Sequence, residues 1–535
     1  MSSLPDQALQ AGMHHDAIEY FALPQGSKSN ASALLAINHE YIDDGLLHAD
    51  GMATWSEAKV AKAQSAHGVS IIEIARRGDR WEVVRPSPYA RRITARTAMT
   101  IAGPAAGHES LRTAADPAGR EVLGTINNCA GGYTPWGTYL TCEENFNMYF
   151  ANAGTIPADQ RRYGIGARSV YRWSEFDARF DASAHPNEPN RFGWVVEIDP
   201  YDREWKPVKR TALGRIKHEG AMVTVAPDGR VVVFTGDDER FEYLYKFVSA
   251  KPWNPRDRAA NRDLLDEGTL FVAKFTEHGQ GAWLELTHGK NGLTAANGFN
   301  SQADVLIRTR QAADAAGATK MDRPEWVAVH PVTQDVYVAL TNNTARGTDK
   351  QPDVDAANPR ARNVYGHIVR FREQGGDVST QKFRWEHFVL AGDPQAPDAA
   401  ARGTVKGDSF GSPDGIWFDH RGVLWIQTDV ASADLRRPDY ERIKNNQMLA
   451  ADVITGEIRR FLVGPKDCEV TGATMTPDGK TMFINIQHPG ELPGSPRNDP
   501  ANPRAGSNWP DFRADGRPRS ATVMIQRDDG GVIGT

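Results

Sequence analysis

A hairpin pattern that recurs along the chain constrains the fold more than any other feature. Each copy has an apolar strand, a turn rich in Pro, Asp or Gly, a second apolar strand and then a polar cluster. Two weaker copies precede four clear ones, and together they cover residues 32–43, 132–146, 221–238, 326–343, 414–430 and 472–488. A hairpin repeated at spacings of roughly 60 to 105 residues predicts an all-β fold, a six-bladed β-propeller.

The long spacing between copies also predicts insertions. Compact blades repeat about every 40 to 50 residues, so we expect long loops and short helical insertions. The candidates are residues 153–191, 250–323 and 349–362, and the best helical start lies near residues 56–66. Residues 491–519 are rich in Pro, Arg, Asn and Asp, which predicts an extended surface segment. No linker divides the chain, so residues 1–535 are predicted to form one propeller domain.

The composition is that of a globular protein and argues against several classes. The 535 residues carry a net charge of −6, which does not favour nucleic-acid binding as a main role. No apolar run reaches the about 18 residues of a membrane span. The three cysteines, Cys129, Cys142 and Cys468, are too few for a disulfide framework. The first residues contain no basic region followed by an apolar stretch, so no signal peptide is expected.

The polar clusters that follow the hairpins are predicted to converge. The hairpins end in NHEYID, TCEEN, TGDD, LTNN, QTDV and IQHPG, and nearby strand starts or loops add KHEGA, DRPEW, SPDGI and DCEVTGAT. In a propeller, the equivalent strand ends of all blades meet around the central channel on one face. Converging carboxylates repel one another and need cations. Oxygen ligands suit Ca²⁺ or Mg²⁺, whereas a thiolate favours a transition metal.

The stretch TYLTCEEN places a thiol beside two carboxylates. Strand alternation puts Cys142 and Glu144 on one side and Glu143 on the other, so one segment can reach two metals. A buried strand cysteine is more often a small core residue than a ligand. The residues alone therefore leave Cys142 open between a core position and a metal ligand, while Cys129 and Cys468 are interpreted as structural.

Other polar residues have structural as well as functional interpretations. A single Asp after a strand is usually a turn or capping residue, and the two Pro-Asp-Gly turns are assigned no function. His218 and His488 are either ligands or histidines with satisfied hydrogen bonds. Arg323, in DRPEW, either clamps an oxyanion beside metals or pairs with a carboxylate such as Asp322.

Several longer motifs, in the same order, resemble the PhoX-type alkaline phosphatases. They are NCAGGYTPWGTYLTCEEN (128–145), LGRIKHEGA (213–221), VFTGDD (233–238), DRPEWVAVHP (322–331), SPDGIWFD (412–419) and VTGATMTPDGKTMFINIQHPG (470–490). MHHDAIEYFAL and LLAINHEYID, near the start, also match. The resemblance covers most of the chain, and the long motif that ends in Cys-Glu-Glu-Asn is highly specific.

This resemblance implies a six-bladed propeller that hydrolyses phosphate monoesters at a cluster of two Fe³⁺ and three Ca²⁺ ions in its channel. It implies that Cys142 is the thiolate ligand of iron and that Arg323 holds the phosphoryl oxygens. The other implied metal ligands are carboxylates, with the choice between Asp237 and Asp238 left open: Glu143, Glu144, Glu219, Asp237, Asp238, Glu325 and Asp414. Clustered cations would bind the ester phosphate, stabilise developing charge and supply a metal-bound oxygen as nucleophile.

The resemblance also implies an exported protein. Members of the family carry a twin-arginine signal, which implies a periplasmic or secreted location. No such leader stands before the matched region, so we expect the N-terminal region to be truncated or processed. The implied partners are small phosphate esters, and we expect a monomer.

Two other function classes fit the residues. A calcium-dependent propeller lactonase or aryl esterase would use the same channel, but it explains neither Cys142 nor Arg323. A non-catalytic propeller scaffold would hold structural calcium in the channel and bind a partner through its insertions. The metal content separates the three classes: iron with calcium, calcium alone, or little metal.

Overall fold

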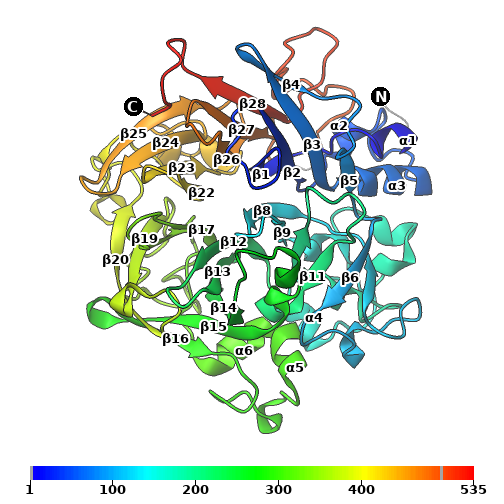
Figure 1. The fold of residues 1–535 in the computed structure, drawn as a ribbon, viewed down its shortest axis with the longest axis vertical. Helices are drawn as coiled ribbons and strands as arrows, with labels where there is room; N and C mark the ends of the chain where they lie inside the picture. Colours follow the sequence, from blue (N-terminus) through cyan, green and yellow to red (C-terminus); the bar gives the residue numbers. More distant parts are fainter. Residues whose placement is uncertain (1–3, 495–497, 535) are drawn as a thin grey trace.

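The computed structural model describes residues 4–494 and 498–534. Its sheets form a ring of six blades (Figure 1), which confirms the predicted six-bladed β-propeller. Five of the six predicted hairpins fall on the inner strand pairs of the blades, whereas residues 32–43 contain a single strand, Ser32–His39, whose partner precedes it in the chain. The innermost strands are β1 (His15–Ala22), β8 (Asn128–Tyr133), β12 (His218–Val225), β17 (Pro324–Val329), β22 (Pro413–Phe418) and β26 (Glu469–Met475).

Further strands continue the first two blades outward. Blade 1 adds β2 (Ser32–His39), β3 (Gly68–Arg77) and β4 (Arg80–Val83), with β5 (Arg91–Ile93) paired to β3. Blade 2 adds β9 (Tyr139–Glu143), β10 (Val195–Ile198), β11 (Val208–Arg210), β6 (Ala98–Ala102) and β7 (Glu121–Leu123). The pairing of β6 with β11 is parallel, so blade 2 takes its outer strands from the chain that precedes its inner hairpin.

Blades 3 and 4 share one hydrogen-bonded sheet. Blade 3 adds β13 (Arg230–Asp237), β14 (Leu244–Pro252), β15 (Gly268–Thr276) and β16 (Gln280–Glu285). Blade 4 adds β18 (Val336–Leu340), β19 (His367–Glu373) and β20 (Lys382–Leu390), and β20 pairs with β16. The predicted insertion at residues 250–323 is therefore partly wrong, because β15 and β16 belong to the blade itself.

The last two blades come from the C-terminal part of the chain. Blade 5 adds β23 (Val423–Thr428), β24 (Gln447–Asp452), β25 (Glu457–Val463) and the short β21 (Lys406–Gly407). Blade 6 adds β27 (Thr481–Gln487) and β28 (Ala521–Gln526). Residues 491–494 and 498–519, between these two strands, contain turns and bends and no helix or strand; the rest of the predicted surface segment lies outside the described residues.

Apolar side chains fill the spaces between neighbouring blades. Successive side chains of a strand point to opposite faces, so each blade contributes to two clusters. On β13, Val232 packs toward blade 4 and Val233 toward blade 2. Six such clusters lie between the six pairs of neighbouring blades. This packing holds the innermost strands in a fixed ring.

The ring closes by side-chain contacts between the first and last blades, without a strand shared between them. β1 packs beside β26, and Thr471 donates a hydrogen bond to the buried Asp16 carboxylate. Thr474 Oγ1 donates to Glu19 Oε1 at 3.2 Å. The two ends of the chain are thus joined next to the inner edge of the ring.

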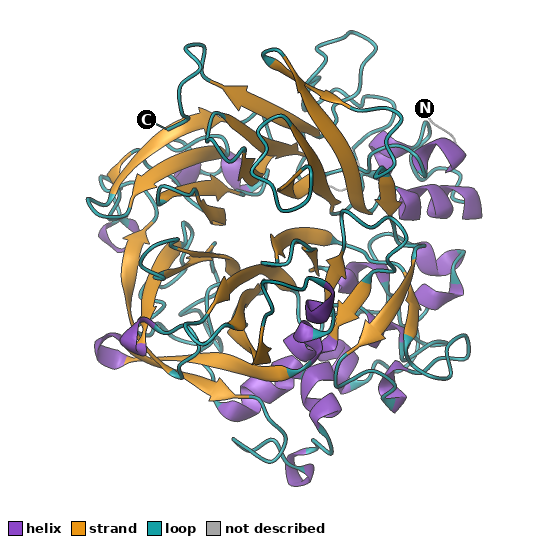
Figure 2. Cartoon of the chain, in the orientation of Figure 1, coloured by secondary structure: helices purple, strands orange, loops and turns teal. Residues whose placement is uncertain are grey.

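Most helices lie at the periphery of the ring (Figure 2). They are α1 (Leu4–Gln7), α2 (Asp44–Leu47), α3 (Glu57–Ser65), α4 (Ala158–Arg162), α5 (Gln302–Ile307) and α6 (Thr309–Ala316). Helix α3 confirms the helical start predicted near residues 56–66, and the Ser56 side chain caps it by accepting from Lys59 N. Across the described residues, the search for a helix long and apolar enough to cross a membrane found none.

Candidate metal centre

Each innermost strand carries a possible metal ligand at its start. The ligand residue is the second residue of five strands and the first residue of β26. These residues are Asp16, Cys129, Glu219, Glu325, Asp414 and Glu469. Because the six strands begin at the same end of the ring, one inner position of every blade supplies a donor to the same region.

A break in strand pairing accompanies these positions in all six blades. The register of the inner hairpin shifts near the start of β1, β8, β12, β17, β22 and β26. In four strands the donor lies between the two paired residues that bound the shift. In β12, Glu219 is the first of those two residues, and in β26, Glu469 lies two residues before the shift. A bulge leaves residues unpaired and re-aims their side chains. The repeated bulge therefore turns a strand residue toward the axis of the ring.

A left-handed residue stands two positions before the donor in five of the blades. These residues have φ between 48° and 57° and none is glycine: His14, Asn127, Arg323, Ser412 and Asp467. This conformation costs a non-glycine residue about 1–2 kcal/mol. Such strain persists where the surrounding structure over-determines the backbone, and it clusters at functional sites. The repeated strain marks this end of the ring as functional.

The loops that follow the second strands add four more donors. Glu40, Glu144, Asp429 and His488 stand just after β2, β9, β23 and β27. Ligand atoms lie within 4.8 Å of one another in four groups: Asp16, Glu40 and Cys129; Cys129, Glu144 and Glu219; Glu219, Glu325 and Asp414; Asp429, Glu469 and His488. We call these ten residues the donor ring. Cys129 and Glu219 each belong to two groups, so the first three groups form a continuous chain.

Burial and mutual repulsion shape the electrostatics of the donor ring. Burial raises the pKa of Asp16 to about 6 and that of Glu144 to about 8. Burial together with neighbouring carboxylates raises the pKa values of Glu219, Glu325 and Asp414 well above the ordinary range. Like charges that share a buried site disfavour the ionised form of each. The protein alone therefore does not compensate these carboxylates.

The donor set fits metal cations. The buried oxygens Asp16 Oδ2 and Glu144 Oε1 have no hydrogen-bond partner in the described part of the chain. Buried acceptors without partners are costly unless an ion or other ligand satisfies them. Carboxylates suit hard cations, and a thiolate or an imidazole suits a transition metal. The combination of many carboxylates with one thiol and one imidazole fits a mixed cluster.

The structure places Cys129, and not Cys142, among the donors. Cys129 Sγ lies 3.0 Å from Glu219 Oε1, in the wide bulge of β8. Cys142 is fully buried on β9 in the apolar cluster between blades 2 and 3, where it pairs with Val195. Sequence reasoning chose Cys142 because it adjoins two glutamates, but the regular pairing of β9 turns its thiol into the core.

Two more predicted ligands are held away from the donor ring. Glu143 Oε1 accepts a hydrogen bond from the buried Lys209 Nζ at 2.7 Å, and its other oxygen accepts from the backbone of Gly193 and Trp194. Asp237 is clamped by the buried Arg310. Both carboxylates have full sets of protein partners and lie outside all four donor groups.

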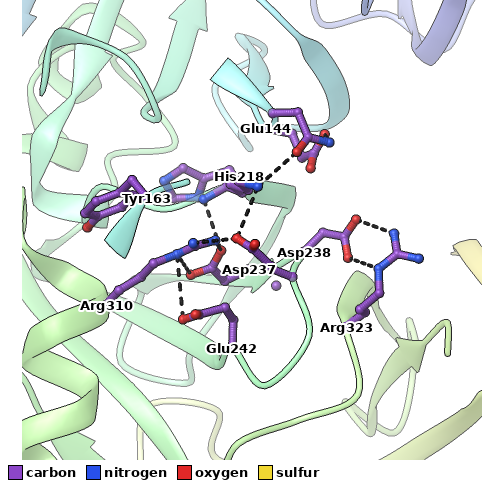
Figure 3. A network of polar contacts seen from close by, with 12 residues as sticks. Glu144, Tyr163, His218, Asp237, Asp238, Glu242, Arg310 and Arg323 are labelled. Carbon is purple, nitrogen blue, oxygen red and sulfur yellow. Dashed lines mark hydrogen bonds and ion pairs between the residues drawn. The ribbon is translucent and has the colours of Figure 1, made fainter. Parts of the chain in front are cut away.

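Asp237 belongs to what we call the ion-pair network. Arg310 of α6 lies between Asp237, Glu239 and Glu242, and Arg162 of α4 links Glu242 to Asp314. Figure 3 shows Arg310 against Asp237 and Glu242, with Asp238 turned away toward Arg323. Unlike the donor ring, this network supplies its own cations.

Asp238 and Arg323 lie beside the donor ring. Arg323 Nε and Nη2 donate to the two oxygens of Asp238 at 2.8 and 2.6 Å, and Nη2 lies 3.3 Å from Glu325 Oε1. The Arg323 side chain is 28% exposed. Its Nη1 has no partner within the described residues. The ion-pair alternative for Arg323 is confirmed, with Asp238 and Glu325 as partners, while Asp322 pairs with Arg346. The clamping of an oxyanion by Arg323 stays a prediction.

The structure thus brings together Glu144, Glu219, Glu325 and Asp414 from the predicted set, with Asp238 and Arg323 beside them. Sequence reasoning left His488 open and did not assign five other donors: Asp16, Glu40, Cys129, Asp429 and Glu469. Their signal was present, because all but Asp16 and Cys129 stand in the polar clusters predicted to converge. The place of each donor in its blade, at the bulge or just after the second strand, identifies them.

Comparisons with known proteins give the family. The family description "Alkaline phosphatase PhoX" matches residues 2–490. A structure of Pseudomonas fluorescens PhoX in complex with vanadate, a transition state analogue, is 47% identical, with a TM-score of 0.93 over 100% of this chain and 92% of that one. A comparison with curated proteins found no match.

More distant structures give only weak likenesses. A protein of unknown function from Dyadobacter fermentans is 8% identical, with a TM-score of 0.38 over 97% of this chain and 96% of its own. A gluconolactonase from Xanthomonas campestris is 12% identical, with a TM-score of 0.29 over 90% and 94%. Neither likeness bears on function. Because the family description covers nearly all of the chain and the PhoX structure matches it throughout, the chain belongs to the alkaline phosphatase PhoX family.

Proposed function

We propose that the donor ring holds the metal cluster with which this alkaline phosphatase hydrolyses phosphate monoesters. The observation that carries the proposal is the convergence of eight carboxylates, one thiol and one imidazole at one end of the ring. The P. fluorescens relative binds vanadate, a transition state analogue. The shared fold and the convergence of donors in this chain support the same class of reaction here.

The groups differ in the metal that they suit. The two groups that share Cys129 contain a thiol, which favours iron. The group of Glu219, Glu325 and Asp414 has only oxygen donors, which favours calcium. We propose the two Fe³⁺ and three Ca²⁺ ions that the resemblance implies, with Cys129 as the thiolate ligand. When bound, the cluster supplies positive charge for the phosphoryl group and activates the attacking oxygen.

Arg323 binds the phosphoryl group in this proposal. Asp238 holds the guanidinium through two hydrogen bonds and fixes its orientation. The free Nη1 then donates to a phosphoryl oxygen. Arg323→Lys keeps the charge but loses the fixed fork of donors. We expect this variant to lose about tenfold or more in kcat/KM, whereas Arg372→Lys, on the outer part of blade 4, should keep the native value.

The location and the oligomeric state of this chain are also proposals. We propose that the protein acts in the periplasm after export and that it is a monomer, as the resemblance implies. Cell fractionation of the native host and light scattering of the purified protein test the two statements. Activity confined to the cytoplasmic fraction, or a stable dimer mass, would contradict them.

Elemental mass spectrometry and a paired assay test the proposed function. We expect bound iron and calcium, hydrolysis of a chromogenic phosphate monoester, and no hydrolysis of a lactone. Calcium alone with lactone hydrolysis would favour the esterase alternative. Little metal and no hydrolysis of either substrate would favour the scaffold alternative.

A further inference from the structure

A cavity of about 230 Å³ adjoins the donor ring at the junction of blades 1 and 6. Its walls come from the segment before β1, the loop after β2, the loop after β27 and the segment before β28. All four segments lie at the end of the ring that carries the donors. The cavity is therefore placed beside the proposed site of reaction.

His488 is shared by the cavity and the donor ring. It lines the cavity, and its Nε2 lies 3.5 Å from Glu469 Oε2. Asp429 belongs to the same donor group as His488, and the charges of His488 and Arg323 both act on its carboxylate. His488 therefore links the cavity to the donor ring. A cavity that adjoins the donor ring can receive the alcohol part of an ester whose phosphoryl group is held there.

The cavity wall suits an uncharged group with an apolar body. Met13, Leu46, Pro489 and Pro518 contribute apolar surface. Among the described lining residues the basic side chain is Arg519, and Asp511 already pairs with it through two hydrogen bonds at 2.9 and 3.2 Å.

Acids on the wall disfavour an anionic group. Asp43 and Glu491 also line the cavity. Asp43 accepts hydrogen bonds from backbone amides at the start of α2 and from Asn498 N, so it is not free to bind a cation of the ligand. An anionic leaving group would meet these carboxylates, and among the described lining residues no Lys or Arg side chain is free to offset them.

Unpartnered polar atoms point to a ligand with hydrogen-bonding capacity near the metals. His14 Nδ1, His488 Nδ1 and Asn498 Oδ1 are buried and have no hydrogen-bond partner in the described part of the chain. All three residues line the cavity, and the His14 and His488 rings lie 5.8 Å apart. Buried polar groups without partners call for a ligand or water.

We propose that this cavity is the leaving-group subsite and that it selects phosphate monoesters of uncharged, ring-sized alcohols. The proposal rests on the proposed function, because it needs the phosphoryl group at the donor ring. A cavity of about 150 Å³ accommodates benzene, so the volume here holds a substituted ring. A small alcohol such as methanol would leave the subsite empty.

Non-hydrolysable phosphonates test the subsite without the chemistry of bond cleavage. We expect phenylphosphonate to inhibit the metal-loaded enzyme with a Ki at least about tenfold lower than that of methylphosphonate. Leu46→Trp, which fills the cavity from a residue outside the apolar clusters, should bring the two Ki values within about threefold. A charged probe, 4-carboxyphenylphosphonate, should bind no better than methylphosphonate.

Controls separate the possible outcomes. Val332→Trp adds the same side chain at an exposed position on blade 4 and should keep the native ratio of Ki values. Leu46→Phe serves as a second variant if the tryptophan variant does not fold. Equal Ki values in the native enzyme, or an unchanged ratio in both Leu46 variants, would overturn the subsite. A lack of inhibition by every phosphonate, together with no ester hydrolysis, would instead overturn the proposed function.

Discussion

The donor ring and the ion-pair network are both buried clusters of acidic side chains, and they meet on the same strands. In the network, Arg310 and Arg162 stand among Asp237, Glu239, Glu242 and Asp314, so the charges are paired within the protein. In the donor ring, eight carboxylates face chiefly one another. A chain that buries like charges without partners is built for a ligand that brings the opposite charge.

The boundary between the two regions runs between neighbouring residues. Glu143 pairs with Lys209 while Glu144 joins the donor ring. Asp237 pairs with Arg310 while Asp238 pairs with Arg323 beside the ring. At each of these strand ends, a buried ion pair holds the side chain of Glu143 or Asp237. The side chain of the next residue then faces the donor ring.

Cys129, which is partly exposed, and Cys142, which is buried, give the sharpest test of this contrast. We expect Cys129→Ala to lose iron and to lose at least about a hundredfold in phosphatase activity, because a metal ligand is removed. Cys142→Ala should keep metal and activity and lose about 1 kcal/mol of stability through a small cavity. Metal content and initial rates of both variants, measured in parallel, check this. Loss of iron from the Cys142 variant with native iron in the Cys129 variant would reverse the assignment.

Replacing Glu143, which pairs with the buried Lys209, and replacing Glu219 of the donor ring should have opposite effects on stability. Glu143→Gln leaves Lys209 buried without its partner, which should cost about 3–5 kcal/mol. Glu219→Gln removes one of several repelling carboxylates, so the metal-free variant should unfold at higher denaturant concentration than the metal-free native protein. The Glu219 variant should also bind less metal than the native protein does. Denaturant unfolding after chelation measures both changes, and equal destabilisation by the two substitutions would refute the contrast.

Removing the metals should add a dependence of stability on pH that comes from the donor ring. The folded pKa values of Asp16 and Glu144, about 6 and about 8, are raised above those of the unfolded chain. Their contribution is therefore complete below about pH 4 and is lost as pH rises through 6 and 8, at about 1.4 kcal/mol for each unit of raised pKa.

Chelated protein should accordingly be less stable at pH 9 than at pH 5, while protein loaded with iron and calcium should not show this loss. Urea unfolding at the two pH values, with and without metals, provides the measurement. The ion-pair network is present in both samples and serves as the internal control. Parallel pH profiles for the two forms would show that the donor ring does not carry uncompensated charge.

The smallest effect is expected at the strained backbone before the donors. Ser412→Gly removes the strain of a left-handed backbone at a non-glycine residue, which costs about 1–2 kcal/mol. The same change removes the hydrogen bond between Ser412 and Tyr440 at 2.9 Å. The stability should change by less than about 1 kcal/mol, with metal content unchanged. Ser412→Val should lose both stability and bound calcium, because Asp414 two residues later would be displaced. Thermal unfolding and calcium analysis compare the two variants, and native calcium in the valine variant would disprove the positioning role.

Much of the fold could be predicted from the sequence. The alternating apolar strands and Pro-Asp-Gly turns identified five inner hairpins and one strand of the sixth, because strand periodicity and turn chemistry are local properties. The outer strands were harder to predict: β15 and β16, through which blade 3 pairs with blade 4, were taken for an insertion. Glu219, Glu325 and Asp414 were identified because each stands at the start of an inner strand.

The order of the residues was enough to predict the blade count, the place where polar residues gather, and the family. Which of two neighbouring side chains faces the donor ring became known from the folded arrangement of the strands. A strand residue turns to one side or the other according to its register, and a bulge changes that register locally without a sequence signal of its own. Cys129 is one of the extra residues of such a bulge on β8, whereas Cys142, opposite the bulge on β9, keeps its regular pairing with β10. The thiol beside two glutamates in the sequence is therefore a core residue, and the thiol thirteen residues earlier lies among the donors.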